Sequence, residues 1–247
     1  MEALFRETVN WPEKSAIRVN TIDGSSMALQ VPILKHRWPL FAENQELALS
    51  LARSLTKDQL KAVLLYTYSD LPAKRAMADI FEKCQLSHPQ SLQQSTFVDD
   101  MRNLMHDTES SDFLLVASDG TQIPVHRCIL AARSKYFRSM FITESLEVIN
   151  SSWSCHRSIT PETLQFFVEY IYTGQISIPQ TIHIIPLCWI AKYLGLSGDK
   201  EVENIVVSAL TLELTDETQE QLFNIAKEWN AKCVMDVIEK YNATRKS

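Results

Sequence analysis

The sequence predicts a helix-rich α+β protein built from two copies of one small domain. Only 5 of the 247 residues are glycine, well below the usual ~7%, and few positions for positive φ favour helices over turn-rich β structure. A segment that begins at Ile17 is repeated without a gap from Phe113. Each copy opens with two short apolar runs around an Asp-Gly pair, which is a strong hairpin signal.

The repeat consists of three blocks in the same order. IRVNTIDGSSMALQVPILKHRWPLF at 17–41 matches FLLVASDGTQIPVHRCILAARSKYF at 113–137. LTKDQLKAVLLYTY at 55–68 matches ITPETLQFFVEYIY at 159–172, and ADIFEKCQLS at 78–87 matches CWIAKYLGLS at 188–197. One short match would be weak, but three ordered blocks with matching apolar positions indicate duplication.

The elements of the second copy follow from local signals. Strands are predicted at 113–117 and 122–125, and helices at about 127–132 and 134–141. Thr160-Pro161-Glu162 then starts a helix with a capping hydroxyl, a proline in the first turn and an acid. The body of this helix is apolar nearly all round, so it is expected at the centre of the core until Gly174 ends it. A further helix pair is expected at about 182–194 and 200–210.

The first copy is expected to follow the same plan with one defect. Its stretch VPILKHRWPLF aligns with the helix pair of the second copy, but it contains Pro39. Proline removes a backbone donor and clashes with the preceding helical turn. The sequence therefore predicts that Pro39 interrupts the second helix of the pair.

Composition and charge exclude several classes of function. The net charge of −6 comes without a basic stripe, which argues against a nucleic-acid partner. The sequence has no run of ~18 apolar residues, so no membrane span is expected. The acidic start does not resemble a secretory signal. Five scattered cysteines match no zinc-site spacing, so they are expected as reduced thiols in a cytoplasmic or nuclear protein. No catalytic motif is present, and neither an enzyme nor a cofactor or metal is expected.

The second copy resembles a BTB/POZ domain over about residues 97–210. The resemblance rests on Ser111-Asp112, His126-Arg127, Leu130, Arg133-Ser134, Tyr136-Phe137, Met140-Phe141, Tyr170-Ile171-Tyr172-Thr173-Gly174 and Ala191-Lys192-Tyr193. It implies two tandem BTB/POZ folds, each a small sheet with a helical bundle, followed by a C-terminal helical hairpin. The implied boundaries are 1–92 for a degenerate BTB domain, 93–210 for the well-matched one, and 211–247 for an extension similar to the 3-box or the start of BACK.

The resemblance also implies a function without chemistry. BTB domains dimerise, and many bind the cullin-3 scaffold of ubiquitin ligases, where an apolar-x-Glu motif in the loop after the Met-Phe pair contacts the cullin. Two registers of this motif are open here, because Ile142-Thr143-Glu144 lies two residues early and Ser145-Leu146-Glu147 has serine at the apolar position. The residues expected to bind cullin-3 are Met140, Phe141, Ile142, Glu144, Leu146, Glu147, Tyr172, Leu222 and Trp229.

Pairing of the two BTB folds within one chain is the second implication, and a homo-oligomer of the chain stays open as an alternative. The first copy has only 13 residues between Phe41 and Leu55, whereas the second has 21 between Phe137 and Ile159, so the first copy is expected to pair and not to bind a cullin. The residues expected in this pairing are Phe97, Val98, Met101, Leu104, Met105, Leu4 and Phe5. Asp112, His126 and Arg133 are expected to be structural.

Two interpretations therefore remain open at this point. In the first, the chain is a cullin-3 adaptor that presents a protein substrate of unknown identity for ubiquitin transfer. In the second, the chain is a BTB scaffold or transcriptional co-regulator platform that assembles without a cullin.

Overall fold

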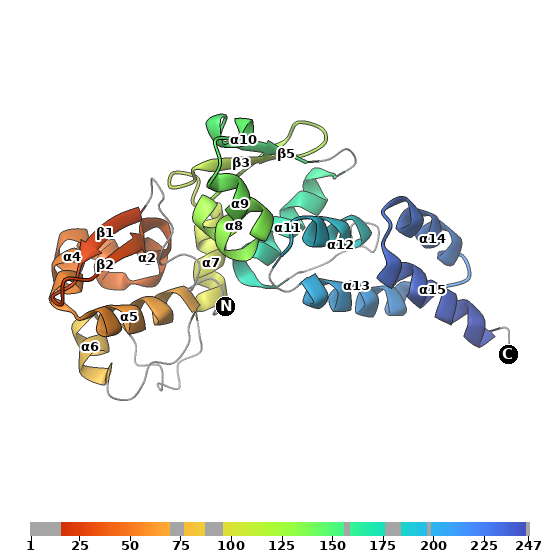
Figure 1. Ribbon diagram of the computed structural model, residues 1–247. Coiled ribbons are helices and arrows are strands. Elements are labelled where there is room, and N and C mark those ends of the chain that lie inside the picture. The colour runs from red at the N-terminus through yellow and green to blue at the C-terminus, as the bar shows by residue number, and fades with distance from the viewer. Residues whose placement is uncertain are drawn as a thin grey trace.

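The computed structural model describes residues 16–69, 77–86, 96–155, 159–175, 184–196 and 199–245. They form three parts in a row, which we call the first unit (16–86), the second unit (97–213) and the tail (214–245) (Figure 1). Helices dominate and the sheets are small, so the predicted helix-rich α+β class is confirmed. Leu4 and Phe5 lie outside the described residues.

The first unit is a hairpin covered by short helices. Strands β1 (Ala16–Asn20) and β2 (Ser26–Gln30) pair antiparallel, with Ile17 opposite Leu29 and Val19 opposite Met27. The turn between them places Gly24 at φ 79°, a conformation that glycine adopts without a steric penalty. The helices that follow are α2 (Val31–Arg37), α3 (Pro39–Glu43), α4 (Gln45–Ser54), α5 (Lys57–Ser69) and α6 (Ala78–Lys83).

The second unit begins with α7 (Phe97–His106) and has a third strand. Strand β3 (Phe113–Val116) pairs antiparallel with β4 (Gln122–Val125) and parallel with β5 (Ser152–Ser154). Helix α11 (Pro161–Thr173) begins after the Thr160 cap and ends at Gly174 in a left-handed conformation, as its sequence predicts. The remaining helices are α8 (Arg127–Arg133), α9 (Lys135–Phe141), α10 (Leu146–Ile149), α12 (Ile184–Tyr193) and α13 (Asp199–Glu213).

The tail is a helical hairpin. It consists of α14 (Gln219–Glu228) and α15 (Lys232–Arg245), and α15 packs on α13 of the second unit. Leu222, Ala226, Val234 and Ile238 are buried, which matches the apolar spacing of the sequence. Within the described residues, no helix has the length and apolar character needed to cross a membrane.

Several hydrogen bonds recur in both units at the offsets of the sequence repeat. They join the hairpin and the short helix pair to the long helix that follows or to the residue two positions before that helix. The equivalent bonds are Gln30 N–H to Tyr68 Oη (2.8 Å) and His126 N–H to Tyr172 Oη (2.9 Å), Arg37 Nε to Thr67 O and Arg133 Nε to Ile171 O (both 3.0 Å), and Ile22 N–H to Leu55 O and Ser118 N–H to Ile159 O (both 3.0 Å).

The expectation for Pro39 was wrong. Pro39 is the first residue of α3, and Trp38 takes the extended cap conformation at φ −125°, close to that of Ser134 before α9 at φ −127°. Proline is tolerated at the first helical position because the N–H that it lacks has no intrahelical partner there. The helix pair of the first unit is therefore intact. Its second helix is shorter than its counterpart because α3 ends at Glu43.

Candidate functional site

The segment between α9 and β5 carries an unusual set of exposed apolar side chains. Ile142, Leu146 and Ile149 are 71%, 73% and 68% exposed. Among the described residues, six large apolar side chains are more than half exposed. One of the other three, Tyr193, lies beside the same segment. Apolar surface that gathers in one place is typical of a protein-binding site.

A shallow depression of about 600 Å³ lies against this segment. Its lining includes Tyr136 and Met140 of α9, Glu147 of α10 and Tyr193 of α12. Tyr136 is held in place because its hydroxyl accepts a hydrogen bond from Trp153 Nε1 at 3.2 Å. An apolar depression beside exposed apolar side chains offers a partner both a pocket and knobs.

The structure distinguishes the two registers of the apolar-x-Glu motif by their local roles. Ile142 caps the C-terminus of α9 and points its side chain to solvent. Ser145 is the N-cap of α10, and its hydroxyl accepts from the Val148 N–H at 3.4 Å. Glu147 is half-buried, and hydrogen bonds from its own N–H and from Ser145 lower the pKa of its carboxyl group. The apolar knobs are thus Ile142 and Leu146, whereas Ser145 shapes the loop.

Several of the residues expected to touch a cullin are not available at the surface. Tyr172 is 1% exposed, so its expected role as a direct contact was wrong, because its hydroxyl is used inside the core of the second unit. Met140 and Leu222 are also buried, at 8% and 7% exposure, although Met140 lines the depression. Phe141 is half-buried and its ring packs on Phe113 at 5.0 Å, whereas Glu144 is exposed.

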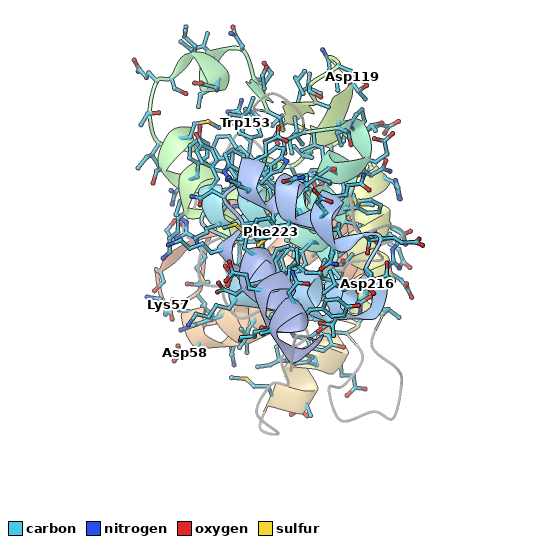
Figure 2. The ribbon with its side chains drawn as sticks, turned by 90° about the vertical axis from the view of Figure 1, so that its right-hand side faces the viewer. Lys57, Asp58, Asp119, Trp153, Asp216 and Phe223 are labelled. Carbon is cyan, nitrogen blue, oxygen red and sulfur yellow. The ribbon has the colours of Figure 1, made fainter. Side chains whose placement is uncertain are left out.

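Trp229, one of the two expected contacts from the tail, lines a different cavity from the one beside the loop. Trp229 packs its ring edge to face on Trp189 at 5.4 Å and lines a separate small cavity with Cys188 and Lys232. Figure 2, seen from the tail side, places Trp153 above the tail residue Phe223. Trp229 and the exposed loop therefore border different hollows of the surface.

The first unit has a different structure at the equivalent place. Helix α4 follows α3 after one residue, and it packs on α3 and β1 through Ala48, Leu49 and Ala52. No strand equivalent to β5 is found in the described part of the first unit. The short connection of the sequence is therefore filled by a packed helix, and Leu47 is the one residue of α4 with a large apolar side chain exposed there.

Helix α7 joins the two units. It packs against α2 of the first unit on one side and α11 of the second unit on the other, in the centre of Figure 1. Phe97, Met101 and Leu104 are buried between these helices, while Val98 and Met105 are half-buried. The residues expected to pair the two BTB folds, as far as they are described, thus lie at the contact between the units.

An ion pair and a cation–π contact reinforce this junction. Arg37 of α2 is 4% exposed in its side chain, and its Nη1 lies 2.6 Å from Asp100 Oδ2 of α7. The same guanidinium lies 4.9 Å from the centre of the Phe97 ring. Thr96 Oγ1 donates to the same Asp100 oxygen at 2.8 Å. The charge of Arg37 is therefore paired by a residue of the other unit.

A second polar chain continues from the junction into the core of the second unit. His36 Nε2 lies 3.3 Å from Asp107 Oδ2, which accepts from the Ser110 hydroxyl at 2.6 Å. Ser110 Oγ is 2.9 Å from His126 Nε2, and His126 Nδ1 is 2.7 Å from Tyr172 Oη. The chain is satisfied when His126 is neutral, donates from Nε2 and accepts at Nδ1.

The remaining residues expected to be structural hold helix ends. Asp112 Oδ1 accepts from the Arg127 N–H at 2.8 Å, at the start of α8. Arg133 Nε donates to the Ile171 carbonyl at 3.0 Å near the end of α11. A carboxylate at the first turn and a guanidinium at the last turn both complement the helix dipole.

Comparison with known proteins assigns the second unit to a family. The family model described as BTB/POZ domain matches residues 101–208. This part of the chain is a BTB/POZ domain. Over 108 residues the chain is 30% identical to BTB and MATH domain-containing protein 41 of Caenorhabditis elegans, covering 44% of this chain and 25% of that protein. Over 67 residues it is 36% identical to Kelch-like protein 21 of Homo sapiens, covering 27% of this chain and 11% of that protein.

The matched relatives are much longer than the shared region. The chain spans a quarter or less of the length of these two curated proteins. Among solved structures, the BTB domain of zebrafish PATZ1 aligns with 50% of this chain and 98% of its own chain, at 22% identity and a TM-score of 0.37.

The buried histidine of the BTB domain makes stability depend on pH. Burial lowers the pKa of His126 from 6.5 to about 4, so the unfolded chain binds this proton first as the pH falls. The folded state keeps its full stability while His126 is neutral in both states, above about pH 6.5. It loses stability as the pH falls from 6.5 to about 4, because the unfolded chain is protonated there and the folded chain is not. We expect about 2 kcal/mol less unfolding free energy at pH 5 than at pH 7 from this group, measured by urea denaturation. The variant His126→Gln should remove this difference, and an equal pH dependence in both proteins would contradict the assignment.

Proposed function

We propose that the chain is a cullin-3 adaptor in which a degenerate BTB fold and a complete one pair within a single chain. The observation that carries this proposal is the exposed row of Ile142, Leu146 and Ile149 beside an apolar depression. Such side chains are stabilised by burial in a partner, each by roughly 1.5–3 kcal/mol. Their place, in the loop after the Met-Phe pair, is the one that the family resemblance implies for cullin contact.

The first unit is, on this proposal, a degenerate BTB fold kept for pairing. The support is the set of hydrogen bonds that recur at the sequence offsets, including those of Arg37 and Arg133 to the following long helix. The residues of α7 that the resemblance assigns to dimerisation pack on α2 of the same chain. Because α4 fills the place of the exposed loop, the first unit offers no second cullin site. One chain then binds at most one cullin.

The alternative function is a BTB scaffold or co-regulator platform that does not bind a cullin. Ser145 favours it, because this residue stands at the apolar position of the motif's common register and its hydroxyl is used to cap α10. On this alternative the exposed loop binds a different protein, and the paired units serve only assembly.

Calorimetric titration of the whole chain with the amino-terminal half of cullin-3 separates the two functions. The adaptor function predicts a saturable heat with one cullin fragment per chain. Absence of binding at concentrations where a known BTB adaptor binds the same fragment would reject the adaptor and favour the scaffold.

A further inference from the structure

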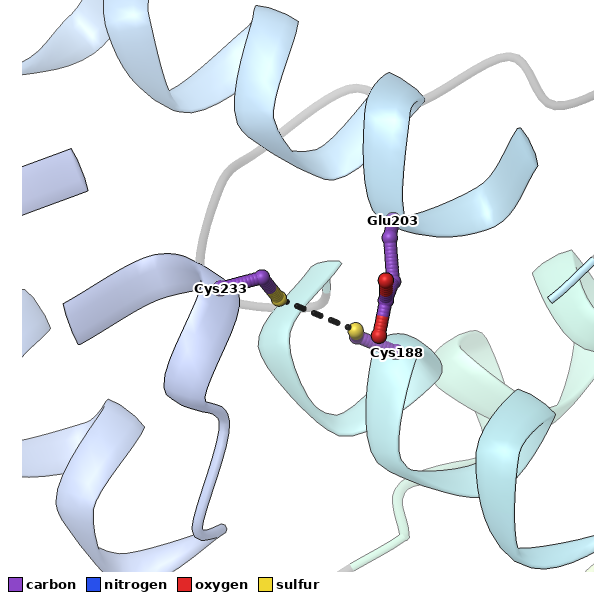
Figure 3. A group of neighbouring side chains, drawn as sticks. All are labelled: Cys188, Glu203 and Cys233. Atoms are coloured by element: carbon purple, nitrogen blue, oxygen red, sulfur yellow. Dashed lines mark hydrogen bonds between the residues drawn. The ribbon is translucent and has the colours of Figure 1, made fainter. Parts of the chain in front are cut away.

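Two cysteines and a glutamate meet where the tail rests on the BTB domain. Cys188 comes from α12, Glu203 from α13 and Cys233 from α15, and Figure 3 shows their side chains directed toward one another. The possible ligand atoms of all three lie within 4.8 Å of one another. The two sulfur atoms are 3.5 Å apart. Among the described residues, this is the one group of three or more such side chains with this spacing.

The distance between the two sulfur atoms is closer to that of two thiolates on one metal ion than to that of a disulfide bond. A disulfide requires an S–S separation of about 2.05 Å. Two thiolates on one tetrahedral Zn²⁺, each with a Zn–S distance of about 2.3 Å, lie roughly 3.7 Å apart. The observed 3.5 Å is close to the second value. The cluster therefore needs little movement to hold a metal ion and much more to form a disulfide.

The cluster borders a cavity that leaves room for one further metal ligand. The three side chains border a cavity of about 250 Å³, which is lined also by Lys192, Lys232 and Asp236. Cys188 is buried, whereas Glu203 and Cys233 are half-buried, so the ligands are shielded but the cavity admits water.

We propose that Cys188, Glu203 and Cys233 bind one Zn²⁺ ion, with water at the fourth position, and that this ion fastens the tail to the BTB domain. Two thiolates and a carboxylate are a donor set that Zn²⁺ accepts. Calcium and magnesium prefer oxygen ligands only, so they fit this set poorly. Because the ligands come from α12, α13 and α15, the ion would link the last helix of the tail to two helices of the second unit.

The test uses the whole chain, purified in reducing buffer and stripped of metal with a chelator. Titration with Co²⁺ should give one ion per chain, with sulfur-to-cobalt charge-transfer absorption and the visible bands of tetrahedral cobalt, and Zn²⁺ should displace it. Cys188→Ser and Cys233→Ser should each weaken binding by about 100-fold or more, since even outer-shell partners of a metal are worth ~10–100-fold. Cys155→Ser, which removes a half-buried thiol outside the cluster, should bind as the unchanged chain does.

Glu203→Gln keeps the test decisive if a cysteine variant fails to fold. This half-buried side chain tolerates an isosteric change, and circular dichroism verifies the fold. Its affinity for Co²⁺ should fall by about 10-fold or more. The proposal is overturned if no charge-transfer absorption appears, if Cys233→Ser or Glu203→Gln binds Co²⁺ as tightly as the unchanged chain, or if Cys188 and Cys233 are joined by a disulfide in chain isolated without air. These readouts need no cullin, so they stand apart from the proposed function.

Discussion

Replacing Leu146 by aspartate is expected to weaken binding of the amino-terminal half of cullin-3 by at least about 100-fold. The side chain is 73% exposed in the free chain, and its burial in a partner is worth roughly 1.5–3 kcal/mol, or about 10–100-fold in Kd. The introduced carboxylate adds the cost of placing a charge against apolar surface. Ile142→Asp is expected to have a similar effect, because Ile142 belongs to the same exposed row. Calorimetry or biolayer interferometry measures both.

The matched control for this prediction is Leu47→Asp in the first unit. Leu47 is also exposed, at 52%, but it lies on α4, which replaces the loop. The Leu47→Asp variant should leave the affinity for cullin-3 unchanged. All three variants should unfold within about 2 °C of the unchanged chain, since substitutions of surface residues usually have small effects on stability. If Leu146→Asp and Ile142→Asp both bind within threefold of the unchanged chain, the loop is not the cullin site.

Replacing Asp100 by alanine is expected to cost about 2–3 kcal/mol of unfolding free energy. Its carboxylate pairs with Arg37, whose side chain is 4% exposed at the junction of the two units. Removing one partner of a buried pair leaves the other charge without compensation, a loss of about 3–5 kcal/mol when both are fully buried. The partial exposure of Asp100, 24%, reduces this figure. Urea denaturation at neutral pH gives the difference.

A neighbouring ion pair on the same helix supplies the control. Asp99 lies 3.2 Å from Arg102, and the two side chains are 77% and 38% exposed. Exposed pairs of this kind contribute about 0–1 kcal/mol, so Asp99→Ala should change stability by less than ~0.5 kcal/mol. Equal losses for Asp99→Ala and Asp100→Ala would show that the Arg37 contact across the units does not stabilise the chain.

Local signals predicted much of the fold from the sequence. The Asp-Gly turns and the alternating apolar residues indicated both hairpins, and the capping Thr160 with Pro161 indicated the start of α11. The prediction for Pro39 was wrong because a proline can either interrupt a helix or begin one, and the sequence alone does not say which position it occupies.

The candidate site was less accessible to sequence reasoning. Tyr172 was named as a contact although α11 is apolar nearly all round, a pattern that already indicated burial. Ile149 and Tyr193 were missed because exposure of an apolar residue depends on tertiary packing, which no local pattern records. Cys188 and Cys233 are 45 positions apart, so their meeting depends on how α15 packs and not on a motif spacing.

The central claim is that the two units pair within one chain and leave a single cullin site. The mass of the complex tests it most directly. Light scattering of the whole chain at low micromolar concentration, alone and with an excess of the amino-terminal half of cullin-3, should give a particle of one chain and then of one chain with one cullin fragment. A stable particle of two chains, or of two chains with two cullin fragments, would contradict the claim.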